Sequence, residues 1–248
     1  MKAVVLAAGY ATRLHPLTRD FPKPLLEVGG RTLLDRLLDR LFELPGLDLV
    51  WVVSNRRFYP HFDRWRQQAG ERRERVWLLD DGTTSPETRL GAVGDLQLAI
   101  ERAGLWEDLL VAAADNILEF PLHGFLNAFR LRGAAHVGVH PVRDPARLRR
   151  TGVAELGADL RVLRFHEKPA DPPSCWAVPP LYLLPGAVVP RVGEYLVEGG
   201  QPDAPGHFMS WLCEREPVYA WRLPGRVWDI GTPAALEEAR RYWDGKPR

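Results

Sequence analysis

The chain has 248 residues and a formal net charge of +1. This length suits one large α/β domain, and the near-neutral charge gives no electrostatic reason to expect nucleic-acid or membrane binding. The two cysteines, Cys175 and Cys213, exclude a disulfide framework and suit a reducing cytosol. No segment approaches the roughly 20 apolar residues of a membrane span, and the apolar run after Lys2 is too short for a signal peptide. We therefore expect a cytoplasmic protein.

The first strand and the loop after it predict a phosphate site. Residues 3–6 form an apolar run that predicts a short buried strand, and the small residues Ala7, Ala8 and Gly9 follow it. Such residues let backbone N–H groups approach a ligand closely, and Arg13 and Lys23 add cations further along. This layout is typical of a phosphate cradle. Small residues after a first strand are also common as plain connections.

Two prolines strengthen the phosphate interpretation. Pro22 and Pro24 flank Lys23, and a residue before proline is disfavoured in the helical region. We expect Lys23 to lie on a stiff, extended segment that aims its ammonium group. A dinucleotide site is less well supported, because G-x-G-x-x-G is absent: Ala11 and Leu14 occupy the second and third glycine positions.

Strands and helices are expected to alternate along the chain, which favours parallel pairing through right-handed crossovers. Apolar runs predict buried strands at residues 49–53, 76–79, 108–114, 135–140 and 176–184. Helical spacing predicts helices at residues 33–41, 93–103, 121–131, 188–196, 208–212 and 233–248, with Thr32 and Thr232 as N-caps. A further helix ends at Gly70, and its apolar stripe is Phe58, Phe62, Trp65 and Ala69.

The second half of the chain carries two predicted hairpins, at residues 153–165 and 218–230, and a basic link that contains proline is expected at residues 141–150 before the first of them. His136 and His140 share a face of the strand predicted at residues 135–140. They stand roughly 13 Å apart along it, which is too far to share a zinc ion. Asp115 directly follows the strand at 108–114, at the edge where open α/β sheets bind ligands. Spacing alone equally allows a turn or cap role for Asp115.

Residues 6–26, LAAGYATRLHPLTRDFPKPLL, resemble the signature of the sugar-phosphate nucleotidyltransferases. Many members of that family have Gly where this chain has Ala11. Two later stretches also resemble family motifs: Glu167-Lys168-Pro169, and residues 228–233, WDIGTP. The matches extend from Leu6 to Pro233, so the resemblance covers essentially one catalytic domain.

The resemblance implies a Rossmann-like three-layer α/β/α fold with a mainly parallel mixed sheet and a small β-hairpin elaboration that binds the acceptor. Residues 1–248 would form one catalytic domain: a nucleotide-binding half (1–133), an acceptor-binding half (134–232) and a C-terminal helix (233–248). The implied reaction transfers a nucleotidyl group from a nucleoside triphosphate to a sugar-1-phosphate and releases pyrophosphate.

The resemblance also implies a role for each site residue. Arg13 and Lys23 would act on the nucleotide phosphates, Asp115 and Asp229 would hold Mg²⁺, and the remaining residues would bind the two substrates. Each aspartate ends a predicted strand at a turn into a helix, so we expect both at the same carboxyl edge of the sheet. The nucleotide-binding set is Leu6, Ala7, Ala8, Gly9, Thr12, Arg13 and Gly91. The acceptor-binding set is Glu167, Lys168 and Tyr182.

Two other functions stay open from the sequence. One is a phosphocholine cytidylyltransferase-like enzyme, in which Trp176 and Tyr182 would face a quaternary ammonium group. The other is a sensor that binds nucleotide without turnover, although Arg13, Lys23 and both aspartates are retained. A glutamine that is common in the family before the loop at residues 80–94 is not evident, so the base is open. The sugar is open too, and so is whether the chain forms a homo-oligomer.

Overall fold

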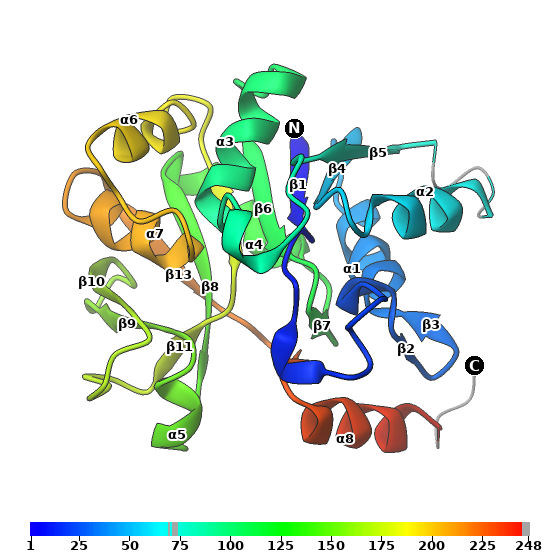
Figure 1. Ribbon diagram of the computed structural model, residues 1–248. Helices are drawn as coiled ribbons and strands as arrows, with labels where there is room; N and C mark the ends of the chain where they lie inside the picture. The colour runs from blue at the N-terminus through cyan, green and yellow to red at the C-terminus, as the bar shows by residue number, and fades with distance from the viewer. Residues whose placement is uncertain (69, 71–73, 245–248) are drawn as a thin grey trace.

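A ten-stranded mixed β-sheet runs through the protein in the order β10-β9-β11-β8-β12-β6-β1-β4-β5, with β13 also paired to β8 (Figure 1). The structure is a computed structural model and describes residues 1–68, 70 and 74–244. Its parallel part consists of β1 (Lys2–Leu6), β4 (Leu49–Ser54), β5 (Val76–Asp80) and β6 (Leu109–Ala113). In β1, Lys2 lies opposite Leu49 on one side and Leu109 on the other, so these strands end level with one another.

The other half of the sheet is largely antiparallel, because β10, β11 and β12 run opposite to the remaining strands. Its strands are β8 (Ala135–Pro141), β9 (Gly152–Leu156), β10 (Val162–Glu167), β11 (Trp176–Val178), β12 (Leu181–Leu184) and β13 (Val218–Arg222). β9 and β10 form the predicted hairpin. The mixed sheet and the hairpin confirm the expected fold class.

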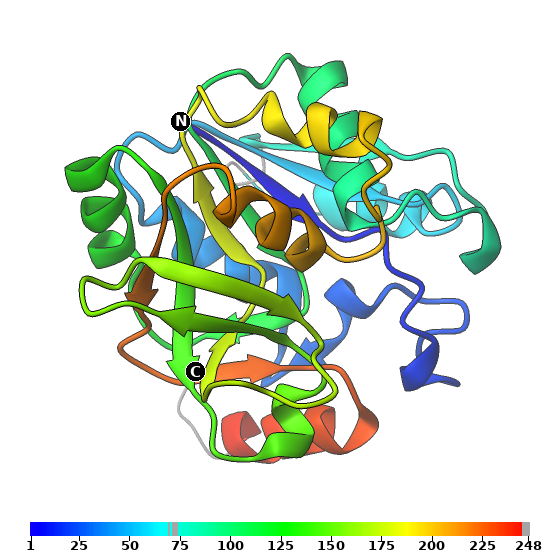
Figure 2. The same cartoon turned by 90° about the vertical axis from the view of Figure 1, so that its left-hand side faces the viewer.

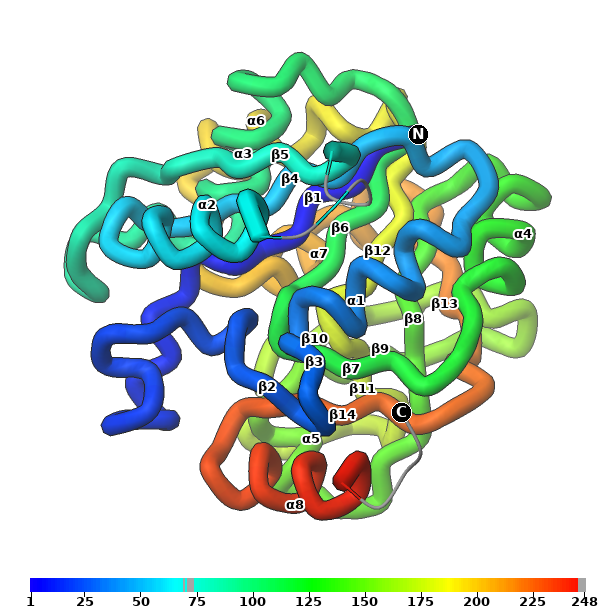
Figure 3. Tube along the Cα trace, turned by 90° about the vertical axis from the view of Figure 1, so that its right-hand side faces the viewer, coloured from blue at the N-terminus to red at the C-terminus, as the bar shows by residue number. Residues whose placement is uncertain are grey.

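Helices cover both faces of the sheet and complete the three layers. One face carries α1 (Leu33–Phe42), α2 (Tyr59–Gln67) and α4 (His123–Arg132) (Figure 3). The other face carries α3 (Ala92–Ala103), α6 (Arg191–Val197) and α7 (Pro205–Cys213) (Figure 2). Each face therefore has its own apolar core, and the sheet between them is buried on both sides.

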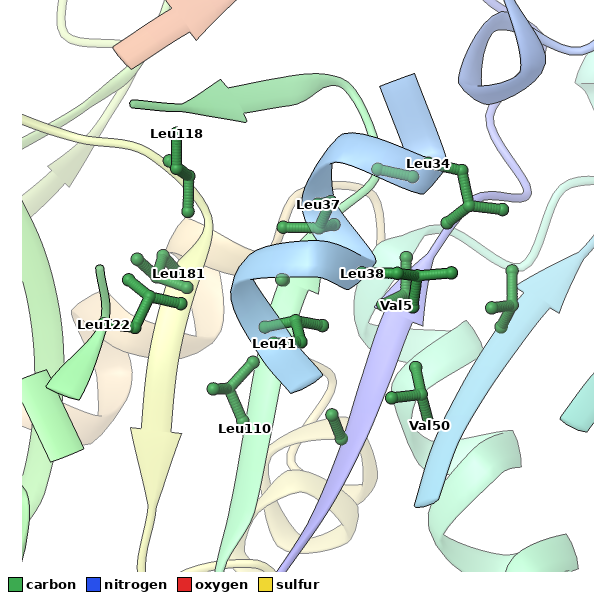
Figure 4. Close-up of a cluster of buried hydrophobic side chains, with 14 of the residues drawn as sticks. Val5, Leu34, Leu37, Leu38, Leu41, Val50, Leu110, Leu118, Leu122 and Leu181 are labelled. Carbon is green, nitrogen blue, oxygen red and sulfur yellow. The ribbon is translucent and has the colours of Figure 1, made fainter. Parts of the chain in front are cut away.

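Helix α1 shows how the sequence pattern produces this packing. The Thr32 hydroxyl oxygen accepts a hydrogen bond from the Asp35 backbone N–H at 3.0 Å, which caps the helix as expected. The leucines at helical spacing then face the sheet, where they pack against residues such as Val5, Val50 and Leu110 (Figure 4). Burying one such leucine contributes about 1.5–3 kcal/mol. α1 is thereby fixed beside the strands that carry the first loop.

Small elements lie around the carboxyl edge of the parallel strands. They are η1 (Thr12–Leu14), η2 (Lys23–Leu25), β2 (Glu27–Val28), β3 (Arg31–Thr32), η4 (Pro86–Thr88), β7 (Asn116–Leu118), α5 (Pro145–Leu148), β14 (Val227–Asp229) and α8 (Pro233–Asp244). The predicted cap of α8 is present, since the Ala235 N–H donates to the Thr232 hydroxyl at 3.2 Å. None of the helices in the described part of the chain has the length and apolar character needed to cross a membrane.

Three expectations about the elements were wrong. The predicted hairpin at residues 218–230 does not form, because β13 pairs with β8 and β14 pairs with β7. The single strand expected at residues 176–184 is two strands, β11 and β12, separated by Pro179 and Pro180, which cannot donate to a ladder. The link at residues 141–150 contains the short helix α5. Ala69 and residues 245–248 of the expected final helix lie outside the described residues.

Candidate active site

A cleft of about 870 Å³ opens at the carboxyl ends of β1 and β6. It lies between the parallel part of the sheet and the strands β9, β10 and β11 at the other end of the same sheet. It is lined by residues from both halves of the chain. Every site residue expected from the sequence contributes to this lining: Leu6, Ala7, Ala8, Gly9, Thr12, Arg13, Lys23, Gly91, Asp115, Glu167, Lys168, Tyr182 and Asp229. The structure thus brings the whole set together, while the role of each residue stays a prediction.

The loop after β1 is held open toward the cleft by a buried asparagine. The Asn55 side-chain amide donates to the Ala8 carbonyl at 2.8 Å, and its oxygen accepts from the Phe58 N–H at 2.8 Å. A Cβ atom at Gly9 would meet nothing within 4 Å, so the backbone there faces open space. The loop therefore has the exposed backbone that an anion cradle requires. Asn55 was not predicted as part of the site.

The next turn of the loop contains the departure from the family signature, Ala11. Ala11 has φ 48° and ψ 41°, a left-handed conformation that glycine adopts without strain. The Thr18 hydroxyl donates to the Ala11 carbonyl at 2.8 Å and holds this conformation. Leu14 is buried beneath η1, so the exposed Arg13 is presented at the cleft from an anchored turn.

Lys23 lies at the centre of the charged part of the cleft. Its Nζ is 2.7 Å from Asp115 Oδ2, and its side chain is 11% exposed. The extended conformation expected for Lys23 was wrong, because Lys23 begins the 3-10 helix η2, although Pro22 before it is extended. A proline in the first turn of a helix removes an N–H that would have no partner there, so Pro24 is accommodated.

Asp115 and Asp229 come together, but by a different route from the one expected. Asp115 follows β6 and precedes β7, whereas Asp229 ends β14, outside the large sheet. The two-stranded β7–β14 ladder places Asn116 opposite Asp229, and the Ile230 N–H donates to the Asp115 carbonyl at 3.1 Å. The Asn116 amide also donates to Asp115 Oδ1 at 2.9 Å. This small sheet joins the C-terminal motif to the end of β6.

The two carboxylates interact electrostatically. Asp229 faces the open cleft but has protein on its other sides, and this partial desolvation, followed by the charge of Asp115, raises its pKa. Lys23, Arg13 and Arg147 act in the opposite direction and lower the pKa. Two carboxylates that lie near each other, with cationic side chains around them, are suited to share a divalent cation.

The far wall of the cleft carries the residues of the Glu167–Lys168 motif. Lys168 Nζ is 3.0 Å from Glu167 Oε1, and the Glu167 side chain is only 9% exposed. A Cβ atom built on Gly206, in the first turn of α7, would lie 1.9 Å from Glu167 Oε2. Gly206 therefore leaves the space that this carboxylate occupies. Tyr182 is buried at the base of the same wall, where burial and the nearby Glu167 raise its pKa.

Sequence reasoning missed several residues that line the cleft. They include Tyr10, Asp81, Arg89, Asp95, His140, Arg147 and Arg150. Asp95 left a detectable signal, since it lies one turn before Ala99 on the apolar stripe of α3, where a charged residue is out of place. Arg147 lies in the short helix α5 and the others lie in connections or at strand ends, so that only the fold brings them to the cleft.

Comparison with curated proteins finds relatives that share a single activity by name. A mannose-1-phosphate guanyltransferase from Pichia angusta is 29% identical over 239 residues, which is 94% of this chain and 61% of the relative. Mannose-1-phosphate guanylyltransferase 1 from Arabidopsis thaliana is 28% identical over 237 residues, covering 94% of this chain and 62% of the relative. The chain thus spans less than two thirds of the length of these relatives.

Solved structures share the fold at lower sequence identity. A structure from Bacillus anthracis, named as a glucose-1-phosphate thymidylyltransferase in complex with sucrose, has a TM-score of 0.84 and 21% identity and covers 100% of this chain and 97% of its own. A UDP-glucose pyrophosphorylase complexed with UDP-glucose has a TM-score of 0.83 and 18% identity, with 98% and 97% covered. The family model described as nucleotidyl transferase matches residues 2–244, and the chain therefore belongs to the nucleotidyl transferase family.

Proposed function

We propose that this protein transfers a nucleotidyl group from a nucleoside triphosphate to a sugar-1-phosphate. An oxygen of the acceptor phosphate attacks the α-phosphorus, the bond from that phosphorus to the bridging oxygen breaks, and pyrophosphate leaves. The observation that carries the proposal is the convergence of Arg13, Lys23, Asp115 and Asp229 with the Glu167–Lys168 motif in one cleft. Family membership and the names of the relatives support the same reaction.

The main obstacle to this reaction is the repulsion between its two anionic substrates, and the cations of the cleft would offset it. Bringing two anions to 4 Å costs about 4 kcal/mol per charge pair at an effective dielectric constant near 20. We assign Arg13 to the leaving pyrophosphate, Lys23 to the α-phosphate and Lys168 to the acceptor phosphate. Alignment of the two substrates can lower the barrier by roughly 7–11 kcal/mol more. The attacking phosphate is already ionised near neutral pH, so no general base is required.

Asp115 and Asp229 fit a magnesium ion. Mg²⁺ in phosphoryl-transfer sites is held by one or two carboxylates together with substrate phosphates, and this pair supplies such a donor set. When bound, Mg²⁺ would neutralise charge on the phosphates. Lys23, which contacts Asp115 Oδ2 at 2.7 Å, would turn to the α-phosphate as the nucleotide enters.

The acceptor end favours a sugar over a quaternary ammonium group. Glu167, nearly buried beside Lys168, suits sugar hydroxyls next to the acceptor phosphate. Trp176, which a choline cage would need, contributes nothing to the cleft lining among the described residues, and the Arg222 guanidinium lies 5.0 Å from the centre of its ring. We infer that residues 1–133 bind the nucleotide and residues 134–232 the acceptor, with the helix from residue 233 closing the domain.

Pyrophosphate release tests the proposal directly. Five nucleoside triphosphates are each combined with several sugar-1-phosphates and with phosphocholine in the presence of Mg²⁺. Release should require both a triphosphate and a sugar-1-phosphate, and it should disappear when EDTA removes the metal. Release with phosphocholine alone would favour the cytidylyltransferase-like function. Nucleotide binding without turnover in any combination would favour a sensor.

A further inference from the structure

The segment between β8 and β9 brings two arginines to the acceptor side of the cleft. Arg147 lies in the short helix α5 (Figure 1), and Arg150 follows it by three residues. Both side chains are exposed and line the cleft, as Lys168 does. Neither arginine belongs to a stretch that resembles a family motif. Their place in the cleft therefore comes from the fold of this segment.

Several contacts fix the segment, although α5 is short. The Asp144 carboxylate accepts a hydrogen bond from the Ala146 N–H at 2.9 Å and caps the helix. Leu148 is 5% exposed and packs into a small apolar cluster. The Arg149 Nε–H donates to the Ala170 carbonyl at 2.9 Å. The two arginines that line the cleft are thus carried on backbone that is anchored between them.

A backbone hydrogen bond joins this segment to the Glu167–Lys168 motif. The Lys168 N–H donates to the Thr151 carbonyl at 3.2 Å. Lys168 itself has φ 48°, a left-handed conformation that is uncommon outside glycine. Because Arg150 directly precedes Thr151, the backbone of Arg150 lies close to that of Lys168. Cations from two separate stretches of the chain therefore meet at one part of the cleft.

The two arginines have no carboxylate partner among the residues that the structure describes. In this they resemble Arg13, which we assign to pyrophosphate. Every other cation of the described cleft lining is paired with a carboxylate at 2.6–3.0 Å: Lys23, Arg89, Lys168 and Arg226. The charges of Arg147 and Arg150 are therefore available to a ligand.

These two charges match what a sugar-1-phosphate brings. Its phosphate carries about −1.5 to −2 near neutral pH. Lys168 does not balance this charge alone, because Glu167 Oε1 lies 3.0 Å from its Nζ and offsets it. His140 of the cleft wall adds no charge, since burial, followed by the charge of Arg147, lowers its pKa to about 4. Two unpaired guanidinium groups supply the missing charge, and each can donate two parallel hydrogen bonds to phosphate oxygens.

Arg147 also lies on the side of the cleft where the transfer would take place. Its charge reaches Asp229 and lowers the pKa of that carboxyl group. The acceptor phosphate must approach the α-phosphorus beside the Asp115–Asp229 pair. We propose that Arg147 and Arg150 bind the acceptor phosphate together with Lys168, and that Arg147 directs the attacking oxygen. This inference rests on the proposed nucleotidyl transfer and adds two residues to its acceptor site. A guanidinium keeps its proton at neutral pH, so no proton moves in this step.

Equilibrium binding tests the phosphate contact without turnover. The dissociation constants of mannose-1-phosphate and glucose-1-phosphate are measured by titration calorimetry at pH 7. Mg²⁺ is present with the α,β-methylene analogue of the tightest-binding triphosphate, whose α–β linkage resists cleavage. Arg147→Ala and Arg150→Ala should each weaken sugar-1-phosphate binding about ten- to a hundredfold, as expected for the loss of hydrogen bonds to a charged group. The affinity for each triphosphate alone should change by less than about threefold, since neither arginine would contact the nucleotide.

Steady-state kinetics separate binding of the phosphate from its positioning. Arg147→Lys keeps the charge but loses the planar pair of donors. It should bind sugar-1-phosphates within a few-fold of the unmodified protein and lower kcat at saturating acceptor at least tenfold. Arg143→Ala is the matched control, because Arg143 is an exposed arginine of the same connection that does not contribute to the described cleft lining. This control should leave both binding and turnover unchanged.

The outcomes separate this inference from the proposed reaction. Unchanged sugar-1-phosphate binding in Arg147→Ala and Arg150→Ala would overturn it, as would an equal loss in Arg143→Ala or no binding by the unmodified protein. Weaker triphosphate binding instead would assign the arginines to the nucleotide. An unchanged kcat in Arg147→Lys would refute the positioning role. Binding that depends on both arginines, with no pyrophosphate release in any combination, would leave the phosphate site standing and refute the transfer reaction.

Discussion

The stability of this protein should fall with rising pH because of Asp95, and Asp95→Asn should remove much of that dependence. The pKa of Asp95 is raised to about 8 in the folded protein, against an ordinary value of 3.8. Between these two values the folded state binds more protons than the unfolded state. The free energy of unfolding therefore decreases as pH rises through this range, and the stabilisation is lost above the folded pKa.

The size of the effect follows from the same two values. Each unit of pKa difference corresponds to about 1.36 kcal/mol, so the full range would change the free energy of unfolding by on the order of 6 kcal/mol. An asparagine at position 95 has nearly the same shape and does not titrate. The variant should match the unmodified protein at pH 5 within about 1 kcal/mol, typical of an isosteric change. At pH 8.5 it should be more stable by several kcal/mol.

Urea unfolding followed by circular dichroism, at half-unit steps from pH 5 to pH 8.5, measures this difference. Glu101→Gln is the control, since it removes an exposed carboxylate from α3, the helix that carries Asp95. The control should follow the curve of the unmodified protein. Parallel curves for Asp95→Asn and the unmodified protein across the whole range would refute the reasoning, because they would show that Asp95 titrates normally in the folded state.

Three further predictions concern the reaction. Lys168→Ala should raise the KM for the sugar-1-phosphate at least tenfold and leave nucleotide affinity intact, whereas Lys23→Ala should mainly lower kcat; equal losses of nucleotide affinity would contradict this division. Asp115→Asn and Asp229→Asn should each lower kcat at least a hundredfold, and the double variant should be little worse than the poorer single one; additive losses would argue against a shared metal ion. Gly206→Ala should raise the KM for the acceptor several-fold by displacing the carboxylate beside it, and an unchanged KM would count against that contact.

The sequence predicted elements well where local rules and packing agree. Helix α1 forms where Thr32 caps a run of leucines at helical spacing, and the strands on either side of β1 are apolar because both faces are buried. Prediction from the sequence failed where the strands that pair lie far apart along the chain. Residues 218–230 have the local character of a hairpin, yet β13 and β14 pair with β8 and β7 instead. Pairing of this kind depends on tertiary contacts that no local window contains.

Asp115 and Asp229 show, within the site, the same difference between what local patterns predict and what only the fold shows. Both residues were expected at the edge where ligands bind, and both line the cleft. The expected reason was that each ends a strand of one sheet. Instead, the separate β7–β14 ladder carries Asp229 to Asp115. Motifs therefore predicted which residues meet, while the path of the backbone between them could only be seen in the fold.

The two ends of the nucleotide differ in how strongly the sequence marks their sites. Phosphates need cations on fixed backbone, and the sequence shows this pattern where Arg13 and Lys23 lie in a short continuous segment with small residues and prolines. A base needs a few buried acceptors with the right spacing, and these can come from any elements that the fold brings together. In this cleft, for example, the lining residues Asp81 and Asp95 come from the end of β5 and from α3. A family signature can therefore mark the phosphate end of a nucleotide site, whereas contacts to a base can come from segments that lie far apart along the chain.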